Sequence, residues 1–154
     1  MKLISISRQT LLLATMLSLT GCASTFLKAY PGKLQPLSET GVVTCEKELM
    51  ITAVDGKLEQ KIFTGGALTF MDCTISLLPG EHAISFYYLH RGSYLITSTR
   101  EVTHKLNVEK GQIYRIKYTM NNQLWKPWIE KLEGDELERV RKDVMSRLKD
   151  QASG

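Results

Sequence analysis

Apolar residues form a run near the N-terminus that only Thr15 and Ser18 interrupt. They alternate with polar residues through the middle of the chain and recur every three or four positions near the C-terminus. Alternation is clearest in residues 102–108 and 113–120. The apolar or aromatic faces of these stretches carry Val102, His104, Leu106 and Val108, and then Tyr114, Ile116, Tyr118 and Met120. A period of two with one polar face is typical of antiparallel strands packed on a core.

Turn signals separate the apolar stretches after residue 40. Asp55-Gly56 is typical of a two-residue hairpin turn, and Pro79-Gly80 and Arg91-Gly92 end two further stretches. Residues 93–108 are long enough for one bent strand or two. Pro127 confines the stretch 124–132 to a sheet edge or a bulge. The pattern therefore predicts a mainly β fold, a small antiparallel β-sandwich with a C-terminal amphipathic α-helix.

The C-terminal helix is predicted from a single apolar stripe after Gly134. Its members share one helical face: Leu137, Val140, Val144, Met145 and Leu148. A stripe of this kind fits a helix that packs on the sandwich. It also fits a helix that docks another protein, so both interpretations stay open.

The N-terminal run is too short to cross a membrane. Leu11–Leu19 is about nine residues long, against the roughly 20 that a transmembrane helix needs. Lys2 and Arg8 precede it without any acidic residue, and small residues follow it. This order predicts a secretory signal peptide.

Leu19-Thr20-Gly21-Cys22 resembles the lipobox of bacterial lipoproteins. The resemblance implies that the signal is cleaved before Cys22 and that the Cys22 thiol and the new amine are acylated. Two or more chains would attach the protein stably to membrane lipid. Ala23 replaces the Asp that usually retains lipoproteins in the inner membrane of enterobacteria, which implies the outer membrane, facing the periplasm, for a Gram-negative source.

Four regions follow from these signals. They are a signal peptide over 1–21, lipidated Cys22 with a tether over 22–40, a β-sandwich over 41–133, and a helix with a tail over 134–154. Cleavage before Cys22 removes Lys2 and Arg8 from the 20 basic residues, which leaves 18 against 16 acidic ones. The mature chain is thus close to neutral, without a clustered basic run, and we expect no nucleic-acid partner.

Cys45 and Cys73 remain after cleavage, and an oxidising periplasm favours a disulfide between them. Two unpaired buried thiols and a metal site are the alternatives. The metal alternative lacks support from the motifs, because the chain has no C-x-x-C and no H-E-x-x-H.

Three turn motifs add a resemblance to small uncharacterised bacterial lipoproteins. They are Tyr-x-Gly at Tyr30, Val-Asp-Gly at Val54 and Leu-Pro-Gly-x-His at Leu78, spread over residues 29–90. Residues 77–88 are also similar to surface-layer repeat domains named for a Pro-Glu-Gly-Ala motif. Both resemblances imply a small β-sandwich, and neither supplies catalytic residues.

Catalytic and metal-binding patterns are weak in this chain. The histidines His82, His90 and His104 are not closely spaced, and no G-x-S-x-G motif precedes a helix. We therefore expect no enzyme activity, no cofactor and no metal. A small periplasmic enzyme or metal-handling protein that uses these histidines is the alternative.

Aromatic residues crowd the second half of the chain. Tyr87, Trp125 and Trp128 are candidates for an exposed contact patch, although core packing would explain the same residues. The resulting hypothesis is a non-enzymatic binding or accessory module of the cell envelope. It would contact membrane lipid through Cys22, and an envelope protein or cell-wall component through its domain. An anchoring subunit of a larger envelope assembly is a further alternative.

Overall fold

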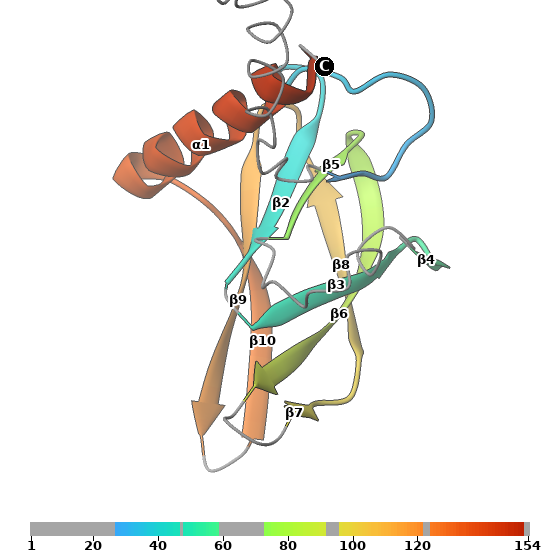
Figure 1. Ribbon diagram of the computed structural model, residues 1–154, viewed down its shortest axis with the longest axis vertical. Coiled ribbons are helices and arrows are strands. Elements are labelled where there is room, and N and C mark those ends of the chain that lie inside the picture. Colours follow the sequence, from blue (N-terminus) through green and yellow to red (C-terminus); the bar gives the residue numbers. More distant parts are fainter. Residues whose placement is uncertain (1–26, 47, 59–72, 92–95, 122–123, 153–154) are drawn as a thin grey trace, which may run out of the picture.

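Two β-sheets face each other in the computed structural model, which describes residues 27–46, 48–58, 73–91, 96–121 and 124–152 (Figure 1). The first sheet has the strand order β1-β5-β2-β9-β10. Its strands are β1 (Leu27–Lys28), β5 (Thr74–Leu77), β2 (Gly41–Cys45), β9 (Ile113–Asn121) and β10 (Leu124–Lys131).

The second sheet is built around a long central strand, β6 (Gly80–Arg91). On one side β6 pairs with β3 (Leu49–Val54), which pairs in turn with β4 (Lys57–Leu58). On the other side it pairs with β7 (Ile96–Ser98) and β8 (Val102–Val108). Residues 93–108 therefore contain two strands in the part that the structure describes.

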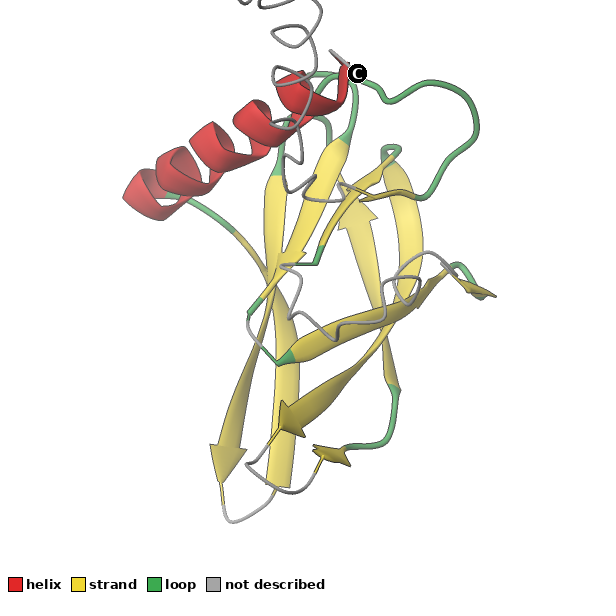
Figure 2. Cartoon of the chain, in the orientation of Figure 1, coloured by secondary structure: helices red, strands yellow, loops and turns green. Residues whose placement is uncertain are grey.

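The main core lies between the sheets. Phe86, Ile84 and Ile51 from the second sheet are buried against residues of the first, including Val43 and Ile116. Because side chains alternate along a strand, one face of each sheet is apolar and supplies this core. Figure 2 shows the strands of both sheets and the helix at one end of the first. The predicted mainly β sandwich with a C-terminal helix is confirmed.

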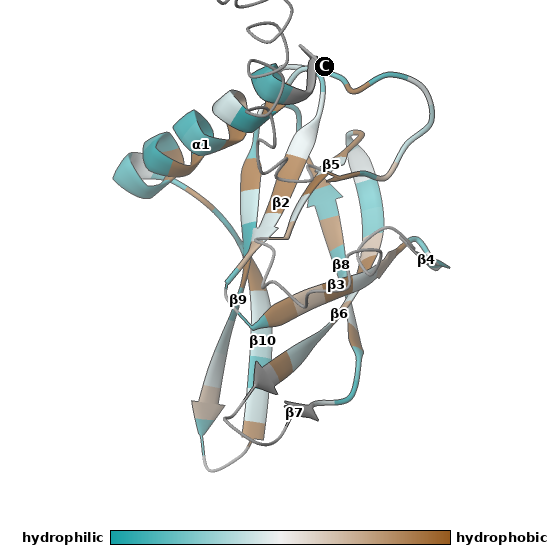
Figure 3. Ribbon diagram, viewed as in Figure 1, coloured by the Kyte–Doolittle hydropathy of each residue, from teal (hydrophilic) through white to brown (hydrophobic). Residues whose placement is uncertain are grey.

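The helix α1 (Gly134–Ala152) covers the opposite face of the first sheet. Val140 and Val144 are buried there against Val42 and Ile113. Leu132, which precedes the helix, is buried in the same cluster. Figure 3 shows apolar bands interrupting the hydrophilic surface of α1. The stripe thus packs on the sandwich, and Met145 at its margin remains 40% exposed. Within the described residues, no helix is long and apolar enough to span a membrane.

Two strand pairs in the first sheet are parallel, where the alternation pattern predicted antiparallel strands. They are β1 with β5 and β2 with β9, and the remaining pairs are antiparallel. Alternation reports which face is buried and contains no information about strand direction. Gly41 at the start of β2 shows how closely the sheets approach, because a Cβ built there would lie 2.3 Å from Val108 Cγ1.

The described part of the expected tether, residues 27–40, lies on the domain. Leu27 pairs with Ile75, and Leu37 and Thr40 are buried. The Tyr30 hydroxyl lies 3.1 Å from Ser76 Oγ. The packed region of the described chain therefore starts before residue 41.

Two local predictions are confirmed. Asp55 and Gly56 join β3 to β4, and both have positive φ angles of 52° and 71°, as a type I′ turn requires. β10, which contains Pro127, stands at the edge of its sheet. Residues 1–26, with the predicted signal peptide and Cys22, lie outside the described residues.

Candidate functional site

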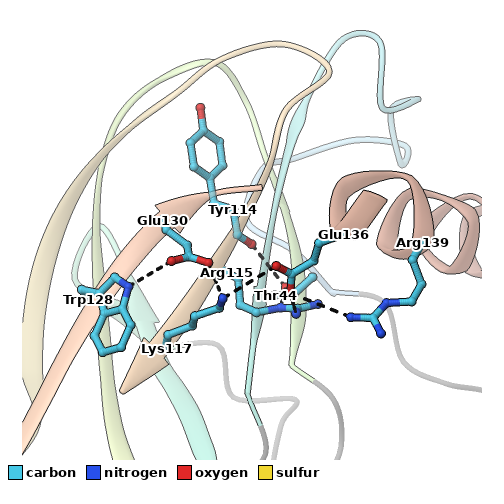
Figure 4. Close-up of polar contacts among 8 residues, drawn as sticks. All are labelled: Thr44, Tyr114, Arg115, Lys117, Trp128, Glu130, Glu136 and Arg139. Carbon is cyan, nitrogen blue, oxygen red and sulfur yellow. Dashed lines mark hydrogen bonds and ion pairs between the residues drawn. The ribbon is translucent and has the colours of Figure 1, made fainter. Parts of the chain in front are cut away.

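A network of polar contacts lies on the charged face between the first sheet and α1 (Figure 4). Arg115 and Lys117 project from β9, Glu130 projects from β10, and Glu136 lies in the first turn of α1. Arg115 and Lys117 are two residues apart on a strand, so they share the face opposite the sandwich core. The helix lies over that face and brings Glu136 to them.

Glu136 is the centre of this network. It forms ion pairs with Arg115 and, at 3.7 Å, with Lys117 Nζ, while Arg139 Nη2 lies 3.9 Å from its Oε1. Lys117 also pairs with Glu130, whose Oε2 accepts a hydrogen bond of 3.1 Å from Trp128 Nε1. The network thus joins β9, β10 and α1 through alternating charges.

The pairing shifts the acid–base behaviour of two groups. The hydrogen bond from Lys117 holds the pKa of Glu130 below its ordinary value, and the Trp128 N–H acts in the same direction. The same hydrogen bond raises the pKa of Lys117, with support from the charges of Glu130 and Glu136 and against the effect of burial. Both groups are therefore held in their charged forms.

A disulfide lies beside this face. Cys45 at the end of β2 and Cys73 just before β5 are paired, with their Cα atoms 5.5 Å apart. β2 and β5 are neighbouring antiparallel strands, and the Cys45 N–H donates to the Cys73 carbonyl at 3.1 Å. Of the three alternatives for these cysteines, the structure supports the disulfide.

A cavity of about 250 Å³ opens between the disulfide and the helix. Thr44, Thr74 and the two cysteines line it from the sheet. Arg115 lines it from β9, and α1 contributes Arg139, Val140, Asp143 and Arg147. Arg115 Nε donates to Thr44 Oγ1 at 3.5 Å, and Arg147 Nε pairs with Asp143 at 2.9 Å. The cavity is therefore lined by three arginines and one carboxylate.

The histidines are dispersed over the second sheet. His82 Nδ1 lies 2.7 Å from Asp55 Oδ2, and its Nε2 lies 2.8 Å from the Leu78 carbonyl. His104 stacks at a tilt on Phe86, with ring centroids 5.4 Å apart. His90 belongs to β6, but its side chain lies outside the described part. Among the described residues, no three His, Cys, Asp or Glu side chains are placed to hold a metal ion.

Asp55 connects the β3–β4 turn to β6 through its contact with His82. It also accepts the Ala83 N–H at 2.8 Å. Although burial opposes the shift, the Ala83 N–H and the contact with His82 lower the pKa of Asp55. These contacts fix the β3–β4 turn against the start of β6.

The three aromatic residues expected to form a contact patch lie on different faces. Trp125 packs against the sandwich core, in an edge contact with Phe86 at 6.1 Å. Trp128, three residues along β10, lies on the opposite face with Glu130. Tyr87 follows the buried Phe86 in β6, so it points out of the second sheet, and its hydroxyl donates to Met50 Sδ at 3.4 Å. The described residues therefore do not bring these rings together.

A tyrosine pair lies inside the sandwich. The rings of Tyr88 and Tyr118 have centroids 4.9 Å apart, and the Tyr118 hydroxyl donates to Glu48 Oε2 at 3.0 Å. Burial and the neighbouring Glu48 carboxylate raise the pKa of both tyrosines. This cluster joins β6 to β9.

Sequence reasoning missed the charged face. The alternation over 113–120 already placed Arg115 and Lys117 together on the polar side, and acidic residues begin the C-terminal helix. The sequence pattern did not reveal the position of the helix, which depends on tertiary packing.

Comparison of the chain with protein-family models, with curated proteins and with solved structures found no match.

Proposed function

We propose that this protein is a lipid-anchored lipoprotein of the bacterial cell envelope whose β-sandwich is a non-enzymatic binding module. The observation that carries the proposal is the sequence Leu19-Thr20-Gly21-Cys22 at the end of a short apolar run that basic residues precede. That order fits export, cleavage and acylation of Cys22. From Ala23 we propose the outer membrane, with the domain facing the periplasm.

The folded domain supports this assignment in two ways. The Cys45–Cys73 disulfide suits an oxidising compartment such as the periplasm. The ion pairs of the charged face hold α1 on the first sheet, which keeps the arginine-lined cavity beside the helix in place as a candidate binding site. We propose that the module retains an envelope protein or a cell-wall component close to the membrane.

Acylation is tested by growing cells with labelled palmitate and comparing the wild type with Cys22→Ala. We expect label and membrane association in the wild type and loss of both in the variant. Cys45→Ala/Cys73→Ala is the matched control, because it removes thiols that are not acylation sites and should keep the label. A Cys22→Ala protein that stays labelled and membrane-bound after export would refute the anchor.

The assignment to the outer rather than the inner membrane is tested separately with the variant Ala23→Asp. By the resemblance to enterobacterial lipoproteins, this variant should move from the outer to the inner membrane on a density gradient, with Ser24→Asp as the control. A wild type that fractionates with the inner membrane would contradict the outer-membrane assignment, and an Ala23→Asp variant that stays in the outer membrane would contradict the role given to Ala23.

A further inference from the structure

The cavity between α1 and the disulfide is a concave site with a polar lining in the described domain. Its volume of about 250 Å³ is below the roughly 300–1,000 Å³ of pockets for drug-sized molecules, so it suits a small group. Arg115, Arg139 and Arg147 line it, and Asp143 is the one carboxylate in its lining. The lining thus carries a positive excess.

Two of these arginines have N–H groups that a ligand in the cavity could accept hydrogen bonds from. Arg115 is 18% exposed, and its contacts with Thr44 and Glu136 use Nε and Nη1, which leaves Nη2 without a partner among the described residues. Arg139 is 76% exposed, and its ion pair with Glu136 is long at 3.9 Å. Guanidinium groups match the geometry of phosphate oxygens with paired N–H donors. The cavity therefore has the chemistry of a phosphate site.

The position of the cavity relative to the anchor selects the source of the phosphate. Leu27 pairs with Ile75, and the residue before Ile75, Thr74, lines the cavity. Only residues 23–26 separate Leu27 from Cys22, a span of at most about 18 Å when fully extended. The polar layer of a membrane is itself roughly 5–7 Å thick on each side. An acylated Cys22 would hold this end of the domain close to the lipid headgroups.

We propose that the arginine cavity binds the phosphate group of an anionic phospholipid in the membrane that anchors the chain. Arg115 and Arg139 donate to the phosphate oxygens, and Arg147 adds positive charge beside them. This contact orients the domain, with α1 and the disulfide toward the membrane and the β9–β10 hairpin away from it. The assignment of a lipid source rests on the proposed anchoring.

Vesicle binding by the mature chain, residues 22–154 with Cys22→Ala, tests the proposal without the anchor. This chain contains every element of the described structure, which begins at Leu27, and a thermal melt checks its folding. Co-sedimentation compares vesicles of phosphatidylcholine alone with vesicles that also contain phosphatidylglycerol. The variant Arg139→Gln/Arg147→Gln is matched by Lys57→Gln/Lys105→Gln, which removes the same charge from the second sheet.

We expect binding to the phosphatidylglycerol vesicles only. The arginine variant should bind about tenfold more weakly, and the lysine variant should stay within about twofold of the wild type. Equal weakening in both variants would show attraction by overall charge and overturn the site. A parallel titration with inorganic phosphate, followed by NMR of the arginine side chains, distinguishes the sources. Saturation by phosphate without vesicle binding would overturn the lipid assignment in favour of a free anion.

Failure of the two proposals is distinguishable, because palmitate labelling of Cys22 does not depend on the cavity. Labelled wild type whose mature domain ignores anionic vesicles would refute the cavity inference and leave the anchor intact. Unlabelled protein whose mature domain binds those vesicles through Arg139 and Arg147 would refute the anchor and make the domain a peripheral lipid binder.

Discussion

Glu136, in the first turn of α1, accepts a hydrogen bond from Arg115 of β9 and thereby ties the helix to the outer face of the first sheet. The side chains of both residues are largely shielded from water, with 34% and 18% of their surfaces exposed. A charged group in such a place depends on its partner, because loss of either leaves the other poorly solvated.

Glu136→Gln should therefore lower the free energy of unfolding by about 1–2 kcal/mol. Glu138→Gln is the matched control, because Glu138 lies in the same helix and pairs with Arg141 at an exposed position. Its expected cost is below about 0.5 kcal/mol. Urea denaturation of both variants measures the difference, and equal costs would show that the Arg115–Glu136 pair does not stabilise the helix contact.

Acid should destabilise the protein partly through Glu130. The pKa of its carboxyl lies below the ordinary 4.5 because Lys117 and Trp128 bind the ionised form. The stabilisation is therefore fully present above pH 4.5 and is lost as the pH falls through the lower folded value. Urea midpoints measured from about pH 6 to about pH 3 should fall less steeply for Glu130→Gln than for the wild type. Glu138→Gln should keep the wild-type slope, and a slope unchanged in Glu130→Gln would contradict the assignment.

Alkali should destabilise the protein through the half-buried pair of Tyr88 and Tyr118. Burial and Glu48 raise the pKa of Tyr118 above its ordinary 10.0, so the folded state keeps a proton that the unfolded chain releases. The contribution of Tyr118 to stability is therefore fully present below pH 10.0 and is lost as the pH rises toward its higher folded pKa. Denaturant midpoints across this range should decrease less in Tyr118→Phe. The midpoint of Tyr87→Phe, which removes a hydroxyl from the outer face, should decrease like that of the wild type. A Tyr118→Phe midpoint that decreases as much as the wild-type midpoint would contradict the role of the Tyr118–Glu48 contact.

Reduction of the disulfide should cost about 3 kcal/mol, because Cys45 and Cys73 close a loop with a sequence separation of 28. Dithiothreitol should lower the urea midpoint of the wild type to near that of Cys45→Ala/Cys73→Ala. The same reagent should leave the double variant unchanged, which makes it the internal control. A wild type that is insensitive to dithiothreitol, with the cysteines shown to be reduced, would argue against a stabilising role for the bond.

Much of the architecture could be predicted because it depends on local pattern. The alternation of Tyr114, Ile116 and Tyr118 reports a strand with one buried face, since side chains of a strand alternate whatever its neighbours are. The spacing of Val140 and Val144 reports a helix with one buried stripe for the same geometric reason. Asp55-Gly56 predicted its turn because few residue pairs accept two positive φ angles.

The candidate site could not be predicted in this way, because it is made of contacts between distant segments. Arg115 and Glu136 are 21 residues apart, and Thr44 and Arg115 are 71 apart. Their approach depends on the parallel pairing of β2 with β9 and on the side of the sheet that α1 covers. The expected aromatic patch was dispersed for the same reason, since Trp125 and Trp128 occupy opposite faces of one strand.

Local patterns in the chain thus establish the β-sandwich, the amphipathic helix and the turn at Asp55, and they predict the export signal with its cysteine. Strand direction, the placement of α1 and the arginine cavity were decided by the tertiary structure alone. The physical reason is that residue periodicity reports how each segment divides its side chains between core and solvent. It contains no information about which segments then pack together, because that choice depends on the shape and charge of both partners.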